Sequence, residues 1–372
     1  MHIIFFFLIM LLSWSSLNAA EVRPLAIDSK APDFKLPATD GEIYSLASFK
    51  SADVLVIIFT ANHCPTAQAY EDKIMKMVDD YAQRGVAFVA ISSNHPDAVR
   101  LDELGYSDLG DSFAEMKIRA ADKKFNFPYL YDGDEQEIAL RYGPTATPHV
   151  FIFDKERRLR YQGRIDDTEN PYIAPTSSDA INAIEALLAG VPAPVETTKV
   201  FGCSMKWRDK VEWAKKADAD WAALPVSVEM IDSSGVAQLV KNESKNVRLI
   251  NVWATWCGPC VVEFPELVKI NRMYRGRNFE FITISADKPT QAEQVLKFLT
   301  GKEAANKNYH FDSTDVYALI DAVDAEWAGA LPYTIIVAPG GKVIYRHMGL
   351  IDPLQVKRAI VGQLGRYYAD NE

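Results

Sequence analysis

The stretch "VRLINVWATWCGPC", from Val247 to Cys260, decides the fold of the second half of the chain. A run rich in β-branched residues leads into two cysteines, and the apolar pattern after them has a helical period. A C-x-x-C pair at the start of a helix brings both sulfurs within disulfide reach, because one helical turn separates them. The motif therefore predicts a redox pair where a strand meets a helix.

The two cysteines of this motif are expected to have different roles. The sulfur of Cys257 would face the unpaired N–H groups and the positive dipole end of the helix. Such a position stabilises a thiolate and lowers a cysteine pKa to about 3.5–7.5. We therefore expect Cys257 to be the attacking nucleophile and Cys260 the resolving thiol. A zinc site would need two further ligands, and the chain has no second C-x-x-C motif.

The same layout occurs earlier in the chain, where "DVLVIIFTANHC" ends at Cys64 and a helical pattern and the strand-like "VAFVAIS" follow. In the second half the corresponding strand-like run is "FEFITIS", and each copy closes with two more strand-like runs around a turn. Pro148 follows Cys64 by 84 residues, and Pro332 follows Cys257 by 75. We predict an α/β protein of two repeated domains, each a central mixed β-sheet flanked by helices.

The first twenty residues predict export. The ten apolar residues from Ile3 to Leu12 match a signal-peptide h-region and are too few to span a bilayer, although no Lys or Arg precedes them. Residues 1–20 are therefore expected to be a signal peptide, cleaved near Ala19 or Ala20. The mature protein would reach a compartment that permits disulfides, such as the periplasm. An uncleaved segment that tethers the protein to the membrane is the alternative.

The composition excludes several classes of protein. A net charge of −10 and the lack of a basic tract argue against nucleic acid as a partner. The length of 372 residues suits two domains. Four cysteines are too few for a disulfide-stapled scaffold, so the thiols are expected to do chemistry. No cofactor is predicted.

The second half resembles thioredoxin and, more closely, the exported TlpA/ResA-like reductases. The resemblance covers roughly Val226 to the end and rests on "NVWATWCGPC", a proline eight residues past the first cysteine (Pro265) and "LPYTIIV". It implies a thiol-disulfide oxidoreductase with a thioredoxin-like fold. In thioredoxin a buried Asp lies six residues before the first cysteine. Here Asn251 stands there, as is usual in the TlpA-like group.

This resemblance also assigns roles to two further residues. Glu263, three residues after the second cysteine, would handle protons near the pair; a solvated charge on the helix surface is the alternative. Pro332 would be the cis proline that faces the disulfide, and an ordinary hairpin proline is the alternative. Its missing N–H would leave Leu331 free to pair with the backbone of a substrate.

The first half, roughly residues 27–207, resembles the AhpC/TSA part of the same superfamily, through "APDFKLPATDGEIYSLASFK" and "NHCPTA". A peroxiredoxin carries P-x-x-x-T-x-x-C and a later Arg. This chain has Ala61 at the Thr position, Ile57 at the Pro position, and Pro148 in the run where the Arg would stand. The peroxidase machinery is therefore expected to be missing, and Pro148 makes the site thioredoxin-like. A thiol peroxidase activity at Cys64 remains the alternative.

The first half is most similar to exported redoxin-domain proteins that pair a "CP" helix start with a distal "GCSIKWK"-type motif, here "GCSMKWR". Ala67 denies Cys64 a C-x-x-C partner, and Ala146 stands where some relatives carry a further cysteine. With the C-x-x-C cysteines paired, Cys203 is the remaining candidate for a resolving thiol. We predict a reversible Cys64–Cys203 disulfide, with Trp207 as an apolar anchor. A merely buried Cys203 and an inert Cys64 are the alternatives.

The expected boundaries follow from this assignment. Residues 24–207 would form the redoxin (AhpC/TSA-like) domain and include Cys203. Residues 208–223 would form a connecting helical segment, and residues 224–372 the TlpA/ResA-like domain. The stretch "VPAPVETTK" is predicted to be a linker without regular structure.

Two histidines raise a different class of function. One thiolate and two imidazoles, from Cys64, His63 and His149, could hold copper, because soft sulfur and imidazole both suit that metal. A copper-binding or metallochaperone role of the first domain is therefore a further alternative. The simpler interpretation, with no metal, makes His63 an exposed neighbour that tunes the thiol and His149 a satisfied strand residue.

These observations together predict an exported thiol-disulfide oxidoreductase. It would reduce disulfides in client proteins through Cys257 and Cys260, and a membrane-embedded thiol-disulfide donor would supply the electrons. The central Gly-Pro dipeptide, as in thioredoxin, favours reduction over oxidation.

Overall fold

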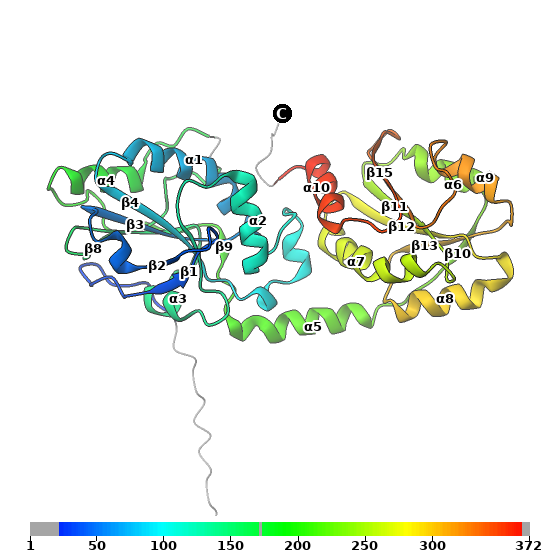
Figure 1. The fold of residues 1–372 in the computed structure, drawn as a ribbon, viewed down its shortest axis with the longest axis horizontal. Helices are drawn as coiled ribbons and strands as arrows, with labels where there is room; N and C mark the ends of the chain where they lie inside the picture. The colour runs from blue at the N-terminus through cyan, green and yellow to red at the C-terminus, as the bar shows by residue number, and fades with distance from the viewer. Residues whose placement is uncertain (1–21, 171–172, 367–372) are drawn as a thin grey trace, which may run out of the picture.

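The two β-branched runs that precede Cys64 and Cys257 form the central strands of two sheets, β3 (Val54–Thr60) and β11 (Val247–Trp253). The computed structural model describes residues 22–170 and 173–366 and shows two bodies, each built on one sheet (Figure 1). The signal peptide expected for residues 1–20 lies outside the described residues. In the part of the chain that the structure describes, no helix has the length and apolar character to cross a bilayer.

The two sheets share one topology. Their strand orders are β5-β4-β3-β7-β8 and β10-β13-β12-β11-β14-β15. In the first sheet β4 and β5 run parallel to β3, β7 runs antiparallel to β3, and β8 runs antiparallel to β7. In the second sheet β12 and β13 run parallel to β11, β14 runs antiparallel to β11, and β15 runs antiparallel to β14; the edge strand β10 pairs parallel with β13. The predicted α/β fold with a mixed sheet in each repeat is therefore confirmed.

The bounds of the other strands follow the sequence pattern closely. The first half has β1 (Lys35–Pro37), β2 (Ile43–Ser45), β4 (Val86–Ser92), β5 (Tyr129–Tyr131), β6 (Ala146–Thr147), β7 (His149–Phe153), β8 (Leu159–Gly163) and β9 (Cys203–Ser204). The second half has β10 (Glu229–Ile231), β12 (Phe279–Ser285), β13 (Lys307–Phe311), β14 (Tyr333–Val337) and β15 (Val343–Met348).

A helix of 17 residues follows each central strand and starts directly at the cysteine motif. These two helices are α1 (Pro65–Tyr81) and α7 (Gly258–Tyr274). The others are α2 (Phe113–Lys123), α3 (Glu137–Tyr142), α4 (Asp179–Leu188), α5 (Val211–Ala222), α6 (Ser233–Lys241), α8 (Ala292–Gly301), α9 (Val316–Val323) and α10 (Pro353–Leu364). Short 3-10 turns lie at Leu46–Phe49, Pro96–Ala98, Leu101–Leu104, Arg208–Lys210 and Pro289–Gln291.

Each sheet is buried on both faces, which explains why its central strands read as nearly continuous apolar runs. Along β3, Leu55, Ile57 and Phe59 enter one core, and the residues between them enter the core on the opposite face. The second sheet is covered in the same way by two apolar clusters. The helices on these faces hold the cysteine-bearing ends of α1 and α7 against rigid strands.

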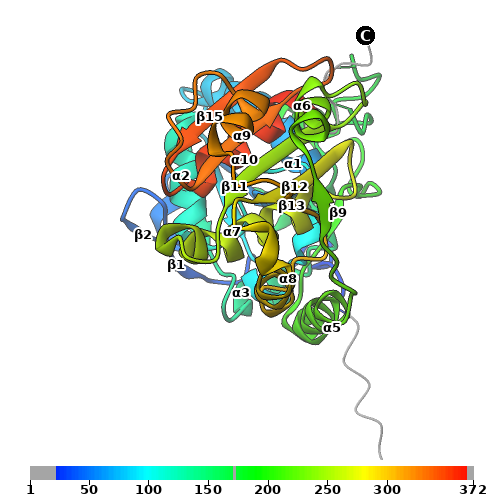
Figure 2. The ribbon, with the colours of Figure 1, turned by 90° about the vertical axis from the view of Figure 1, so that its right-hand side faces the viewer.

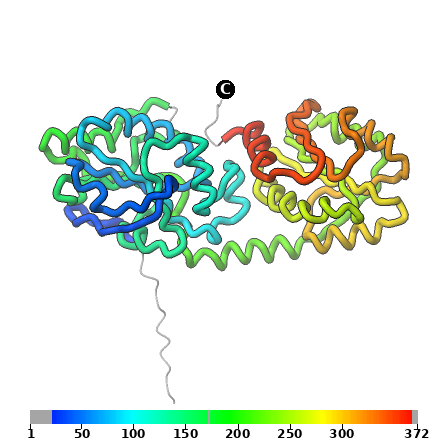
Figure 3. Tube along the Cα trace, viewed as in Figure 1, coloured from blue at the N-terminus to red at the C-terminus, as the bar shows by residue number. Residues whose placement is uncertain are grey.

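The helix α5 connects the two bodies and runs alongside both of them (Figures 1 and 3). Figure 2, which faces the second body, shows α5 end-on below α8. Near its end, Trp221 is buried in the apolar cluster that contains Trp253 and the C-x-x-C cysteines. The bodies also touch directly, because the Tyr274 hydroxyl donates to the Ser107 carbonyl oxygen at 2.7 Å. Leu101 and Leu104 of the first domain also pack against the core of the second, so the two domains meet through polar and apolar contacts as well as through α5.

Candidate active site

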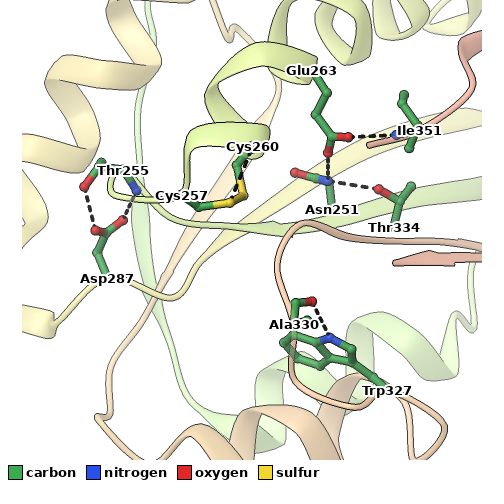
Figure 4. Close-up of a disulfide and its surroundings, with 10 residues drawn as sticks. All are labelled: Asn251, Thr255, Cys257, Cys260, Glu263, Asp287, Trp327, Ala330, Thr334 and Ile351. Atoms are coloured by element: carbon green, nitrogen blue, oxygen red, sulfur yellow. Dashed lines mark hydrogen bonds between the residues drawn. A yellow bond between two sulfur atoms is a disulfide. The ribbon is translucent and has the colours of Figure 1, made fainter. Parts of the chain in front are cut away.

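Cys257 and Cys260 form a disulfide at the start of α7, with their Cα atoms 5.3 Å apart (Figure 4). Cys257 is the N-cap residue, and its Sγ accepts a hydrogen bond from the backbone N–H of Cys260 at 3.3 Å. Cys257 is 6% exposed and Cys260 1%, next to Trp256, which is 67% exposed. This order of exposure favours attack at Cys257 and resolution by Cys260, the roles expected from the sequence.

Glu263 lies on the buried side of α7 and points toward the sheet (Figure 4). One carboxylate oxygen accepts from Asn251 Nδ2 and the other from the Ile351 N–H, each at 3.0 Å. Burial raises the pKa of Glu263, and the two hydrogen bonds offset only part of that rise. At 4% exposure the side chain is no solvated surface charge, so that alternative is wrong.

The loop that leads into the disulfide is held by a contact that the sequence did not indicate. Asp287, at the end of β12, accepts hydrogen bonds from the Thr255 N–H at 2.9 Å and from the Thr255 hydroxyl at 2.6 Å (Figure 4). Asp287 is buried, and the Ser285 hydroxyl donates to it at 2.7 Å. This network fixes the backbone two residues before Cys257 and so orients the attacking sulfur.

Both prolines that the sequence singled out follow cis peptide bonds, Thr147–Pro148 and Leu331–Pro332. Leu331 packs against the apolar cluster that contains the disulfide. The cis-proline loop of the second domain therefore lies beside the redox pair, where the resemblance places it.

Cys64 occupies the N-cap of α1, the position that Cys257 has on α7. Its side chain is completely buried. Its Sγ accepts from the Ala67 N–H at 3.4 Å and donates to the Thr147 carbonyl oxygen at 3.1 Å. Burial by itself raises the pKa of the Cys64 thiol, but a hydrogen bond from Cys203 and the charge of His63 bring that pKa down to about 6.

Cys203 lies directly against Cys64, although 139 residues separate them in the sequence. The two-residue strand β9 pairs antiparallel with β6, and Cys203 is opposite Thr147. Both cysteines are free thiols, and Cys203 is partly exposed. The hydrogen bond to Cys64 is the main cause of the raised pKa of Cys203, and burial adds to it. The structure therefore brings together the two cysteines that the sequence paired.

The glycine of the "GCSMKWR" motif has a steric role that the sequence analysis missed. Gly202 has a φ of +125°, and a Cβ at this position would lie 2.0 Å from the Thr147 carbonyl oxygen. Only a residue without a side chain allows the backbone to approach this closely. The rest of the motif holds the segment in place, since Met205 is buried in the first core and Trp207 packs against it, as expected of an anchor.

A buried His–Asp pair stands next to Cys64. His63 Nδ1 lies 2.6 Å from Asp111 Oδ2, and the His63 N–H donates to Asp111 Oδ1 at 3.0 Å. Asn94 Nδ2 donates to the same carboxylate at 2.8 Å. Burial, the largest single effect, lowers the pKa of His63, but the charge and hydrogen bond of Asp111 and the charge of Cys64 together outweigh it, and the net pKa is raised. The expectation that His63 is exposed is wrong, because it is 1% exposed behind the loop that carries Asp111.

The comparisons with known proteins agree with this arrangement. The AhpC/TSA family model matches residues 27–162, and the Redoxin family model matches residues 223–359. The chain belongs to the redoxin and AhpC/TSA families, with one domain of each in tandem.

Its relatives include thiol-disulfide oxidoreductases. It is 34% identical over 141 residues to the thiol-disulfide oxidoreductase ResA of Oceanobacillus iheyensis, which covers 38% of this chain and 67% of that protein. The ResA of Halalkalibacterium halodurans is 27% identical over 112 residues, 30% of this chain and 58% of that protein. A solved structure of a hypothetical protein from Sinorhizobium meliloti 1021 is 32% identical, with a TM-score of 0.44, and covers 50% of this chain and 96% of that one. By its similarity to the Oceanobacillus protein, the chain belongs to the ResA-like group of thiol-disulfide oxidoreductases.

The structure does not provide a set of ligands for the copper site considered above. In residues 22–170 and 173–366, no group of three or more His, Cys, Asp or Glu side chains could hold a metal ion. His149 stacks on Phe151 with ring centroids 4.4 Å apart, and its Nδ1 accepts from the Thr145 N–H at 3.2 Å. Burial lowers the pKa of His149 to about 3, so it stays neutral. The expectation of a satisfied strand residue holds for Nδ1 only, because the buried Nε2 of His149 has no hydrogen-bond partner among the described residues.

The AhpC/TSA-like domain also has an apolar wall where a peroxide would need polar groups. Ala61 and Ala67 are buried and form one cluster with Cys64 and Cys203. No hydroxyl stands at position 61 to orient a peroxide, and Pro148 is part of the cis-proline loop. The thiol peroxidase alternative therefore lacks the groups that would activate its substrate.

Proposed function

We propose that this protein is exported and reduces disulfides in client proteins through Cys257 and Cys260. The observation that carries the proposal is the redox pair at the N-terminus of α7, with the accessible sulfur at the N-cap and the second sulfur buried behind it. Export rests on the apolar pattern of residues 1–20.

The reaction follows from this arrangement. The reduced Cys257 thiolate attacks one sulfur of a client disulfide and displaces the other as a thiolate, which forms a mixed disulfide. Cys260 then attacks the sulfur of Cys257, releases the second client thiol and closes the Cys257–Cys260 disulfide. Two electrons pass to the client in each cycle. Glu263, whose raised pKa keeps it able to carry a proton, supplies and accepts protons in the exchange.

A reductase in an oxidising compartment needs a source of electrons. We infer a membrane-embedded thiol-disulfide donor, because the oxidised pair has to be reduced again outside the cytoplasm. The same sulfur of Cys257 would receive these electrons, since the buried Cys260 is the less accessible of the two.

An apolar groove next to the redox pair supports the binding of extended client segments. It has a volume of about 330 Å³, and Trp256, Val316 and Leu319 are among the residues that line it. Val316 is 54% exposed. Exposed aromatic and aliphatic side chains beside a reactive sulfur provide contact area for an unfolded or extended client.

The proposal is tested with two serine variants and an insulin-reduction assay. Cys257→Ser should lose essentially all activity, because no nucleophile remains at the N-cap. Cys260→Ser should accumulate mixed disulfides with clients, because the resolving thiol is gone. Lys269→Ser, an exposed change on the same helix, is the matched control and should keep full activity. A Cys257→Ser protein with most of its activity would overturn the proposal. N-terminal sequencing of the protein from an extracytoplasmic fraction tests export.

A further inference from the structure

The first domain has an additional short strand, β9, beside its cis-proline loop. In the first domain the residue before the cis proline, Thr147, pairs with Cys203 on β9. In the second domain, Leu331 pairs with no strand among the described residues. The first domain therefore carries an additional strand of its own, and this strand places a thiol over the buried Cys64.

We propose that Cys64 and Cys203 form a second dithiol–disulfide centre, in which Cys203 exchanges with an external protein dithiol and Cys64 is the buried leaving group. The roles are the reverse of those in the second domain, where the N-cap cysteine is the more exposed of the two. The proposal stands apart from the Cys257–Cys260 pair, because neither of those cysteines takes part in it.

The difference in exposure determines which of the two sulfurs an external thiolate attacks. Cys64 is 0% exposed, beneath Cys203 and the Thr147 carbonyl, whereas Cys203 is partly exposed on β9. A thiolate approaching the disulfide from solvent therefore meets the sulfur of Cys203 first. Attack on Cys64 would require β9 to leave its place, and the packing of Met205 opposes this.

The surroundings of Cys64 stabilise the thiolate that leaves. The Ala67 N–H donates to its sulfur at 3.4 Å, at the positive end of α1. His63, which is next to Cys64 in the chain, is held by the buried carboxylate of Asp111. Asp111 stabilises the charged form of the imidazole, and that positive charge favours a negative sulfur. His63 and Asp111 act as positioning residues for the leaving group.

The reaction balances with a protein dithiol as the reductant. A thiolate of that dithiol attacks the Cys203 sulfur, the bond between Cys64 and Cys203 breaks, and Cys64 leaves as a thiolate. The second thiolate of the reductant then attacks the reductant's first sulfur in the mixed disulfide, and Cys203 leaves as a thiolate that takes a proton from solvent. The reductant becomes a disulfide, and two electrons reduce the Cys64–Cys203 bond to two thiols. In this step the centre accepts two electrons from the protein dithiol.

The experiment uses the full chain with Cys257→Ser and Cys260→Ser, so that Cys64 and Cys203 are the remaining thiols. The protein is oxidised with glutathione disulfide, quenched in acid, alkylated and mapped by mass spectrometry. The expected product is a cross-link between Cys64 and Cys203 in most molecules, which dithiothreitol removes. Two free and separately alkylated thiols would overturn the proposal.

A second measurement on the same protein tests whether Cys203 or Cys64 is the sulfur that is attacked. Brief treatment of the oxidised protein with glutathione should place glutathione on Cys203 at least ten times more often than on Cys64. A majority on Cys64 would overturn the assignment of the leaving group. Gly202→Ala should slow formation of the cross-link at least tenfold, because its Cβ displaces β9. Gly276→Ala, which has open space for a Cβ, is the control and should cross-link like the parent.

Discussion

The sharpest prediction concerns the ionisation of Cys64 and its dependence on His63. With a pKa of about 6, the Cys64 thiol is about nine-tenths ionised at pH 7, whereas a thiol with an ordinary pKa is only a few per cent ionised. His63→Gln removes a charge that lowers the pKa of Cys64, and a neighbouring opposite charge is worth about 1 to 3 pKa units. The ionised fraction at pH 7 should fall to between about one half and about one hundredth.

The assay is a pH titration of the thiolate ultraviolet absorbance, in the full chain with Cys257 and Cys260 changed to serine and the other thiols reduced. Because the pKa of Cys203 is raised, it should not titrate below neutral pH, and a single step should appear with a midpoint near pH 6. Asp72→Asn, an exposed change on α1, is the matched control and should leave the midpoint in place. A parent midpoint above about pH 8, or an unchanged midpoint in His63→Gln, would refute the reasoning.

Four further predictions concern the second domain and the interface. Because burial raises the pKa of Glu263, its contribution to stability is greatest at acid pH and is lost as pH rises through that pKa; Glu263→Gln should flatten this part of the stability profile in urea titrations, and a profile parallel to the parent's would contradict it. The same change should lower the pKa of Cys257 in the reduced protein, measured by the pH dependence of alkylation, whereas an unchanged profile would remove Glu263 from the exchange. Trp221→Ala should cost about 3–5 kcal/mol of unfolding free energy, because it empties a buried site in the second core, and a loss below about 1 kcal/mol would contradict that packing. Arg366→Ala breaks the ion pair with Asp108 in the loop at residues 105–111 and should lower the unfolding free energy by about 1 kcal/mol or less, since the pair is partly exposed. Hydrogen exchange of that loop should become faster, and unchanged exchange would show that the ion pair does not hold the loop.

Much of the fold could be predicted because strands and helices leave periodic patterns. The runs "VAFVAIS" and "FEFITIS" became β4 and β12 with the same bounds. The cis prolines and the helix start at Cys257 could also be predicted, because local motifs encode them. The proximity of Cys64 and Cys203 was predicted because Cys203 is the cysteine that remains once Cys257 and Cys260 are paired, and the two lie together in the structure.

The residues of the site that the sequence did not predict lie on loops, where the hydrophobic pattern has no regular period. Asp111 is 48 residues from His63, and nothing in its local sequence indicates that the loop folds back over the histidine. Asp287 reaches Thr255 over 32 residues in the same way. Without these partners His63 reads as a surface residue, because isolated histidines on loops are commonly exposed. Burial of polar side chains depends on tertiary contacts, and a single sequence does not display these.

The short path from β9 to α5 couples the two domains mechanically. β9 ends at Ser204 and α5 begins at Val211, so a few residues separate the strand over Cys64 from the helix that carries Trp221 into the second core. The second domain cannot swing away as a rigid body without pulling on this segment or unseating Trp221. A displacement of the second domain would therefore act, through α5, on the segment that places Cys203 against Cys64.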